Sequence, residues 1–455
     1  MFIIDIMMAI SNWLWGWPLL ILTSAVAVYL SVRFKFFQFT RFGHAMKNTF
    51  GKIFDKGDGE GDISPFQACC TALASTLGGG NIAGVSVAIA TGGPGAVFWM
   101  WAVALMGFIV KFSEITLGMA YRERDPETGR WHGGFYWYVR RGLGKSWKWL
   151  GIFWAVILGC AMVFAPAVQA NSVVEAIRVS FDVPGWIVGV IFAVIMAVVL
   201  VGGIKSISSF AEKVVPLMAL AYVIGSIFIL VKFGSNIPHV FAMIFEYAFT
   251  PMAATGGFAG ATVMMAIRLG VARGLFSNES GLGSAPIAAA AARTSQPVVQ
   301  ALISMTQTFI DTLVVCSMTG LVILVTGVWT SGKNGAPLTS YAFETGLPGE
   351  LGGLIVTIGI ILFAYSTILG WSYYGEKAIE YLLGSKAIIP YRWAFIISVG
   401  LGASMKLDLV WTLSDIFNAL MAFPNLIGLI MLTPVVKAET LAYLRSLKKE
   451  PASEG

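Results

Sequence analysis

The 455-residue sequence has little charge. Asp, Glu, Lys and Arg make up 12% of it, about half of the share that is usual in soluble domains. Hydrophobic residues make up 57%, and the mean hydropathy is +0.78. Too few polar side chains remain to cover a globular surface in water. The composition excludes a soluble enzyme, a nucleic-acid-binding protein and a disordered scaffold, and it predicts an all-α polytopic membrane protein in the lipid bilayer.

Cysteine and histidine are also scarce. The four cysteines lie in apolar stretches and the three histidines are scattered, so we expect neither a disulfide framework nor a Cys/His metal site. The sequence has no clustered acidic residues and no HExxH-type helix. We therefore expect no enzyme activity and no organic cofactor. A channel is a less favoured alternative, because no selectivity-filter signature is present.

Apolar runs near the length of about 20 residues needed to cross a bilayer recur along the chain. We count eleven, of which the first covers residues 6–32 and the last covers residues 408–436. Six segments that should share one side of the membrane hold 23 of the 30 Lys and Arg residues. These segments are 33–62, 121–148, 203–213, 292–296, 373–392 and 437–455. The positive-inside rule then predicts a plasma-membrane protein with its N-terminus outside and its C-terminus in the cytoplasm.

The second predicted span contains residues that disfavour a continuous helix. Gly78, Gly79 and Gly80 follow one another there and are followed by Asn81. Each glycine costs about 1 kcal/mol relative to alanine in a helix, and non-helical backbone in a membrane must be buried in protein or line a cavity. A break exposes N–H groups on one side and C=O groups on the other, which suits a zwitterion or an ion with a substrate. Close helix packing of the GxxxG type is the alternative, but it does not explain three consecutive glycines.

The seventh predicted span, RLGVARGLFSNESGLGSAP, is also interrupted by glycines, and it contains Glu279. An ionisable residue in a span is a functional candidate. Glu279 accepts hydrogen bonds from the opened backbone, pairs with Arg273 or another arginine, or takes part in coupling. Asp311 in the next span is a second carboxylate in an apolar segment. Each of the two interrupted spans begins a set of five spans. Because five is an odd number, the second set crosses the membrane in the orientation opposite to that of the first. Interrupted segments at matching places in two halves are typical of transporters.

This organisation predicts an extra N-terminal transmembrane helix, two five-helix repeats, the segments that join them and a tail. In chain order the expected boundaries are residues 1–33 for the extra helix, 34–62 for a cytoplasmic linker, 63–234 for the first repeat, 235–256 for an extracellular connection, 257–436 for the second repeat and 437–455 for a cytoplasmic tail.

At these residues the chain resembles the alanine or glycine:cation symporter family. The matching stretches are TLGGGNIAGVSVAIATGGPGAVFWMW at 76–101, RGLFSNESGLGSAPIAAAAA at 273–292 and AYSTILGWSYYGEKAIEYL at 364–382. The resemblance implies a LeuT-like five-plus-five inverted repeat with an extra N-terminal helix. It also implies symport of a small neutral amino acid, alanine or glycine, with Na+ by alternating access. Coupling to protons through Glu279 or Asp311 is the alternative.

The resemblance also implies two sites. Na+ would be held by the carbonyl oxygens of Ala74, Leu77 and Phe363 and by the hydroxyls of Ser366 and Thr367. Without the resemblance, these hydroxyls would be expected to bond to carbonyls of their own helix. The substrate carboxylate would meet N–H groups of the first break. The ammonium would meet carbonyls near Thr76 and at the second break, expected around Gly274 and Phe276, and aromatic side chains would close the pocket. The expected substrate-binding residues are Thr76, Gly78, Gly79, Gly80, Asn81, Gln169, Gly274, Phe276 and Trp371.

Overall fold

The computed structural model describes residues 2–51, 53–126, 129–181, 183–200, 203–402, 405 and 407–449, so the end of the predicted tail, 450–455, lies outside the described residues. Nearly all of this part of the chain is helical. The one sheet found among the described residues is an antiparallel ribbon of β1 (Glu123–Arg124) and β2 (Trp131–His132).

The helices of the first half run from the N-terminus to the middle of the chain. They are α1 (Phe2–Leu14), α2 (Trp17–Arg33), α3 (Phe37–Thr40), α4 (Phe42–Phe50), α5 (Pro65–Thr76), the π-helix η1 (Gly80–Gly84), α6 (Val85–Gly92), α7 (Gly95–Ala120), α8 (Phe135–Gly142), η2 (Lys145–Trp147), α9 (Lys148–Phe164), α10 (Pro166–Phe181), α11 (Gly185–Leu200) and α12 (Gly203–Lys232).

The helices of the second half begin with two short elements of the connection between the halves. They are η3 (Gly234–Asn236), α13 (Ile237–Glu246), α14 (Val263–Asn278), α15 (Ala285–Ala289), α16 (Pro297–Thr308), the π-helix η4 (Phe309–Cys316), α17 (Ser317–Val325), η5 (Val328–Thr330), α18 (Gly335–Gly346), α19 (Leu351–Leu383), η6 (Ser385–Ala387), α20 (Ile388–Gly402) and α21 (Leu407–Lys449).

Seven helical segments among the described residues are long and apolar enough to cross a membrane, and an eighth is the bent pair α5 and α6. The predicted first span is divided: α1 ends at Leu14 and α2 starts at Trp17, although the two together still form one candidate span. The molecule is thus a nearly all-helical, multi-pass membrane protein.

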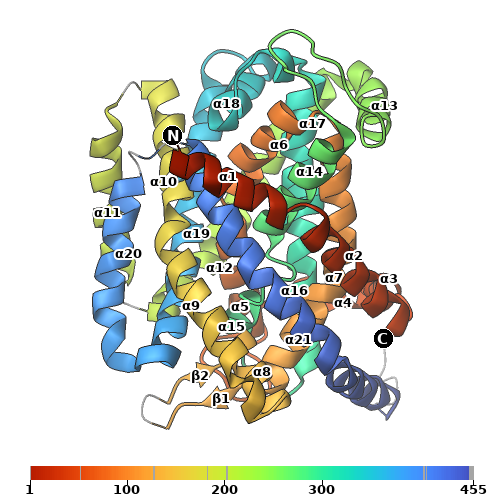
Figure 1. Cartoon of the computed structure of the whole chain (residues 1–455), viewed down its shortest axis with the longest axis vertical. Coiled ribbons are helices and arrows are strands. Elements are labelled where there is room, and N and C mark those ends of the chain that lie inside the picture. Colours follow the sequence, from red (N-terminus) through yellow and green to blue (C-terminus); the bar gives the residue numbers. More distant parts are fainter. Residues whose placement is uncertain are drawn as a thin grey trace.

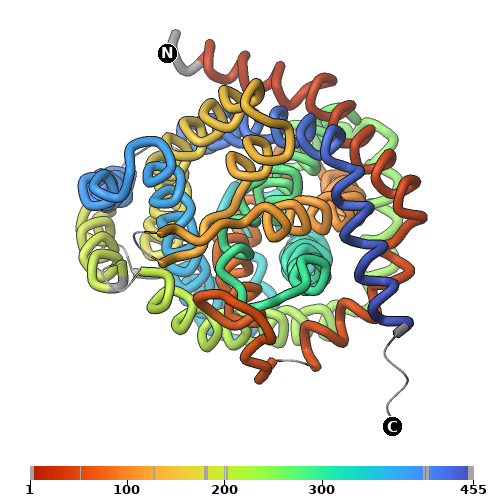
Figure 2. The backbone as a smooth tube through the Cα atoms, turned by 90° about the horizontal axis from the view of Figure 1, so that it is seen from below, coloured from red at the N-terminus to blue at the C-terminus, as the bar shows by residue number. Residues whose placement is uncertain are grey.

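The helices form a bundle in which the two interrupted segments are central. Figure 2, which views the bundle from one end, shows α5 and α14 surrounded by the other helices. Every residue of α5 from Ala68 to Thr76 is buried. α7 packs against α14 and α16, and α19 packs against α9 and α10. Helices α11 and α20 lie side by side at one edge of the bundle (Figure 1).

The outer helices expose large apolar side chains. On α12, Leu217, Phe228 and Val231 are 68%, 69% and 75% exposed. In water such a surface would be an aggregation liability, whereas lipid chains solvate it without cost. By contrast, α19 is buried on every side from Phe363 to Ala378, as expected of a helix in the interior of a bundle. The sequence-predicted candidates on α19 therefore lie in the interior.

Candidate functional site

The first helix break lies where the glycine triplet predicted it. A capping box between Ser64 and Gln67 starts α5, which ends at Thr76. At Leu77 the backbone turns to an extended conformation with ψ 91°. The chain resumes as the π-helix η1 at Gly80 and then as α6, and the two halves are bent by 49°. This confirms the interruption and leaves backbone groups of Gly78 and Gly79 outside the helical hydrogen-bond ladder.

Asn81 connects this break to two other helices. Its Oδ1 accepts a hydrogen bond from the Gly78 N–H at 2.8 Å. Its Nδ2 donates to Ser277 Oγ on α14 at 2.9 Å and to Asp311 Oδ1 on η4 at 2.7 Å. The side chain of Asn81 is fully buried. It thus holds the first break in a fixed position against the second half of the chain.

The N–H of Gly79 points at a side chain from the first half. It donates a 2.7 Å hydrogen bond to Gln169 Oε1 on α10. A Cβ at Gly79 would lie 2.9 Å from that oxygen and 3.0 Å from Ser172 Oγ. Only glycine therefore allows this close approach. The Gln169 amide oxygen occupies the position at which a substrate carboxylate is expected, and it has the same acceptor chemistry.

The hydroxyl of Thr367 reaches the carbonyl end of the same break. Thr367 Oγ1, on α19, donates to the carbonyl oxygens of Ala74 and Leu77, both at 3.0 Å. The neighbouring Ser366 Oγ donates to the Phe363 carbonyl of its own helix at 2.9 Å. Three of the oxygens expected at the Na+ site are thus gathered across two helices. The other two expected ligands, the Phe363 carbonyl and the Ser366 hydroxyl, are bonded to each other within α19.

Thr76 is bonded more locally than the break itself. Its hydroxyl donates to carbonyls of its own helix, at Leu73 and Ala72, and accepts from Gln307 Nε2 at 3.1 Å. Gln307 also donates to the Ala72 carbonyl at 2.9 Å. The last turn of α5 is therefore anchored to α16, a contact that sequence reasoning missed.

The second break lies later in the chain than expected. α14 continues through Asn278, and Glu279 adopts a left-handed conformation with φ 54°. Gly281 and Gly283 follow with positive φ before α15 begins. Gly274 lies inside the helix, where a Cβ would be 2.5 Å from Val103 Cγ1 on α7. The expectation that the break begins around Gly274 is wrong in position, because this glycine serves helix packing.

Glu279 does not pair with Arg273, which was one of several roles that the sequence left open for it. Glu279 accepts hydrogen bonds from Trp371 Nε1 at 2.8 Å and from Ser284 Oγ at 2.7 Å. Arg273 instead forms an ion pair with Asp415 on α21. The left-handed turn at Glu279 directs the chain away from α14, so the two residues are not neighbours on one helix face. Trp371, expected to close the substrate pocket, thus also binds the second break.

Phe276 lies between the two breaks. Its ring is 2.9 Å from where a Cβ of Gly80 would stand. It makes edge contacts with Trp371, with the ring centroids 5.9 Å apart, and a tilted contact with Trp411 at 4.9 Å. These three aromatic rings form a layer against the N-terminal side of η1.

Asp311 occupies the centre of a polar cluster. Its carboxylate accepts from Asn81, Ser277 and Thr312, each at 2.7 Å, and it is fully buried. It lies on the π-helix η4, a distortion that is common at functional sites. Ser277 was not among the sequence-predicted site residues. The signal that could have found this cluster is the run of Thr, Gln and Asp at residues 306–312 within an apolar span.

The whole chain matches a known family of membrane proteins. The model of the sodium:alanine symporter family matches residues 1–454. An uncharacterized transporter of Haemophilus influenzae is 47% identical over 98% of this chain and 97% of its own length. The sodium/alanine symporter AgcS of Methanococcus maripaludis is 44% identical over 98% of both chains.

A solved structure shares the architecture at low sequence identity. The crystal structure of MhsT in complex with L-phenylalanine matches with a TM-score of 0.54 and 12% identity, over 84% of this chain and 100% of the other. At this identity the match concerns the fold, which is LeuT-like.

Proposed function

Because this chain belongs to the sodium:alanine symporter family, which is a family of transporters and not of enzymes, we propose that it imports alanine or glycine together with Na+ across the plasma membrane. Transport proceeds by alternating access around the first break. The observation that carries this proposal is the hydrogen bond between the Gly79 N–H and Gln169. The Gly79 N–H is a buried backbone donor, and a ligand oxygen can replace Gln169 as its acceptor.

The substrate carboxylate replaces the Gln169 oxygen at Gly79 and reaches the neighbouring N–H group of Gly80, while the N–H of Gly78 stays bonded to Asn81. The amide of Gln169 is then available to either end of the amino acid, since it carries both a donor and an acceptor. The ring of Phe276 and Trp371 enclose the side chain. Contact of Phe276 with Gly80 favours a substrate with no more than a methyl-sized side chain.

Na+ is the second substrate and binds where Thr367 reaches Ala74 and Leu77. Neutral oxygen ligands suit a hard cation, and all three oxygens belong to residues with 1% exposure or less. Phe363 and Ser366 complete the site. The Na+ site uses the carbonyl end of the first break, and the substrate site uses its N–H end. Each ligand therefore stabilises the backbone conformation that the other ligand needs. That linkage is the source of coupling.

The membrane topology completes the proposal. Eleven spans place the N-terminus outside and the C-terminus in the cytoplasm, and 63–234 and 257–436 are the two inverted repeats. The support is the distribution of basic residues, of which 23 of 30 fall in segments on one side. Helix α8 and the ribbon β1–β2, at the bottom of Figure 1, belong to that side.

The experiment is uptake of labelled L-alanine into proteoliposomes with and without an inward Na+ gradient at fixed pH. Accumulation above equilibrium only with Na+ supports the proposal. Accumulation that follows a proton gradient instead supports the alternative, in which Glu279 or Asp311 carries the proton. Unlabelled alanine inside the vesicles should accelerate entry of the label, and absence of this acceleration would favour a channel.

A further inference from the structure

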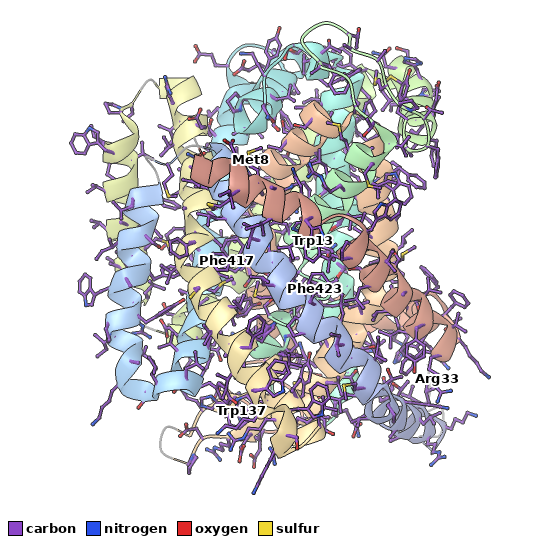
Figure 3. All side chains as sticks on the ribbon, viewed as in Figure 1. Met8, Trp13, Arg33, Trp137, Phe417 and Phe423 are labelled. Atoms are coloured by element: carbon purple, nitrogen blue, oxygen red, sulfur yellow. The ribbon has the colours of Figure 1, made fainter. Side chains whose placement is uncertain are left out.

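A group of ionisable side chains lies where the ribbon β1–β2 meets α19. Asp125 follows β1, His132 is the last residue of β2, and Glu380 is in the last turn of α19. We name these three residues the ribbon cluster. Trp137 of α8, labelled at the lower end of the bundle in Figure 3, packs edge-on against the His132 ring. Glu380 comes 13 positions after Thr367, about 20 Å along a helix, so the ribbon cluster is distinct from the first break.

The fold brings the ribbon cluster together from distant parts of the chain. The Asp125 N–H donates to the Arg130 carbonyl at 2.9 Å, and the hairpin that this bond helps to close places Asp125 beside His132. Glu380 is 248 positions from His132 and is contributed by α19. The scattered histidines were the reason to expect no Cys/His metal site. One histidine between two carboxylates is a different pattern, and only the folded chain creates it.

The distances within the ribbon cluster are close to those of a metal site. Each residue offers one ligand atom, and these atoms lie within 4.8 Å of one another. His132 Nε2 is 3.3 Å from Asp125 Oδ2, and His132 Nδ1 is 3.9 Å from Glu380 Oε2. Ligands of a tetrahedral zinc ion lie about 2.0–2.2 Å from the metal, and hence about 3.4 Å from one another. The longest separation must shorten by about 1.4 Å, which is within the reach of side-chain rotation.

Two buried atoms of the ribbon cluster make no hydrogen bond to the described residues. His132 is 5% exposed and Glu380 is 8% exposed. Glu380 Oε1 has no donor, and His132 Nε2 faces Asp125 without the geometry of a hydrogen bond. Buried polar atoms are nearly always satisfied in folded proteins. A metal ion between these atoms would satisfy both of them.

Lys377 is the cation that binds Glu380 in this structure. Its Nζ donates to Glu380 Oε2 at 2.8 Å and also lies 5.8 Å from the centre of the Tyr373 ring. This pair leaves Glu380 Oε1 unused. An ammonium beside the ribbon cluster repels a metal ion and lowers its affinity. The repulsion makes Lys377 a useful test position, because removal of its charge should strengthen metal binding.

The ligand atoms indicate the kind of ion. An imidazole nitrogen suits a transition metal, and carboxylates complete such sites in many proteins. Mg2+ prefers oxygen ligands in octahedral geometry and usually keeps several waters. Among divalent ions with this preference for nitrogen, Zn2+ binds more tightly than Mn2+. The ribbon cluster therefore matches Zn2+ better than Mg2+ or Mn2+.

We propose that the ribbon cluster is a binding site for a divalent transition-metal ion of the Zn2+ type, held by Asp125, His132 and Glu380 and completed by water. The bound ion joins the ribbon β1–β2 to the end of α19 and fixes the connection between α7 and α8 against the bundle. This site is independent of the proposed function, because neither an amino acid nor Na+ takes part in it.

The test is equilibrium dialysis of the purified, tag-free, full-length protein against labelled Zn2+ at about pH 7.5, where an imidazole with its ordinary pKa of about 6.5 is neutral. We expect one ion per chain. Glu380→Gln and Asp125→Asn each keep the shape of the side chain and remove a ligand charge. Each should weaken Zn2+ binding by at least about tenfold, the change that 1.4 kcal/mol produces. An excess of Mg2+ should not displace the ion.

Two further variants separate the ribbon cluster from other places where Zn2+ binds. Lys377→Met removes the ammonium and keeps a long side chain, so Zn2+ affinity should rise by at least about threefold. His239→Gln removes an exposed histidine outside the ribbon cluster, and its affinity should equal that of the unmodified protein. Zn2+ should also raise the melting temperature of the unmodified protein, because it binds the folded state, and this rise should be lost in Glu380→Gln.

The outcomes that overturn the proposal are distinct. Absence of Zn2+ binding by the unmodified protein overturns it, as does equal binding by Asp125→Asn and Glu380→Gln. Asp125 lies in a loop and its side chain is 26% exposed, so Asp125→Asn provides the answer if Glu380→Gln does not fold. Loss of binding in His239→Gln assigns the ion to the surface. Displacement of Zn2+ by Mg2+ contradicts the transition-metal preference. None of these results depends on transport.

Discussion

Replacement of Thr367 by alanine tests the Na+ site most directly. The substitution removes the hydroxyl that lies 3.0 Å from the carbonyl oxygens of both Ala74 and Leu77. It leaves the fold of α19 intact, because alanine is the best helix former. A hydrogen bond or ligand contact to a charged group contributes about 1.5–3 kcal/mol net. Since 1.4 kcal/mol corresponds to a factor of ten, the half-saturating Na+ concentration for alanine uptake should rise by at least about tenfold.

The assay is initial alanine uptake into proteoliposomes over a Na+ titration, at constant ionic strength and pH. Thr367→Ser keeps the hydroxyl and should stay within about threefold of the unmodified protein. Ser372→Ala is the matched control: it removes a buried hydroxyl from the same helix, one that donates only to the Leu369 carbonyl at 2.6 Å. If Thr367→Ala and Ser372→Ala both keep the original Na+ dependence, Thr367 is not a ligand and the reasoning fails.

Three other substitutions address the substrate path and the alternative coupling ion. Gly79→Val should abolish equilibrium binding of labelled alanine, since a Cβ there would stand 2.9 Å from the Gln169 oxygen; retained affinity would show that the carboxylate binds elsewhere. Gln169→Leu removes the amide that the proposal assigns to the bound amino acid, so the rise in melting temperature on adding alanine should be smaller than in the unmodified protein, and an equal rise would show that this amide does not bind the substrate. Asp311→Asn should lower the melting temperature, because an amide cannot accept from all three donors, yet leave the pH dependence of uptake between about pH 6 and 8 unchanged; a lost pH dependence would favour proton coupling.

The parts of the site that follow from local sequence were predictable. Three consecutive glycines before Asn81 destabilise a helix wherever it lies, and the break occurs there. The second interruption was recognised as well, but not its position. Gly274 and Gly281 are equivalent by composition, yet one packs against Val103 and the other has φ 97°. Whether such a glycine packs against another helix or forms a turn depends on which helix lies opposite it in the structure.

The contacts that join the break to other helices were not predictable from the sequence. Gln169 and Gly79 are 90 residues apart, and Asp311 and Asn81 are 230 apart. No periodicity relates such positions, because the pairing depends on how the helices pack. The same limit explains why the partner of Arg273 could not be predicted. Glu279, six positions away, was one candidate, whereas Asp415 on α21 is 142 positions away.

The charges buried between the helices favour a cationic co-substrate. Lys111, Glu114, Glu279 and Asp311 are at most 3% exposed, and Arg273 is already neutralised by Asp415. Glu376, Lys377 and Glu380 are also buried but belong to ion pairs. Apart from such pairs, one ammonium faces three carboxylates among the described residues, and the carboxylates at the two breaks are held by neutral donors, not by cations. Uncompensated negative charge is costly in a membrane. A positive ion entering the bundle lowers that cost wherever it binds, whether it is Na+ at Thr367 or a proton on a carboxylate. The interior therefore favours a cation in general, and only the local oxygen ligands on α5 and α19 favour Na+ over the proton.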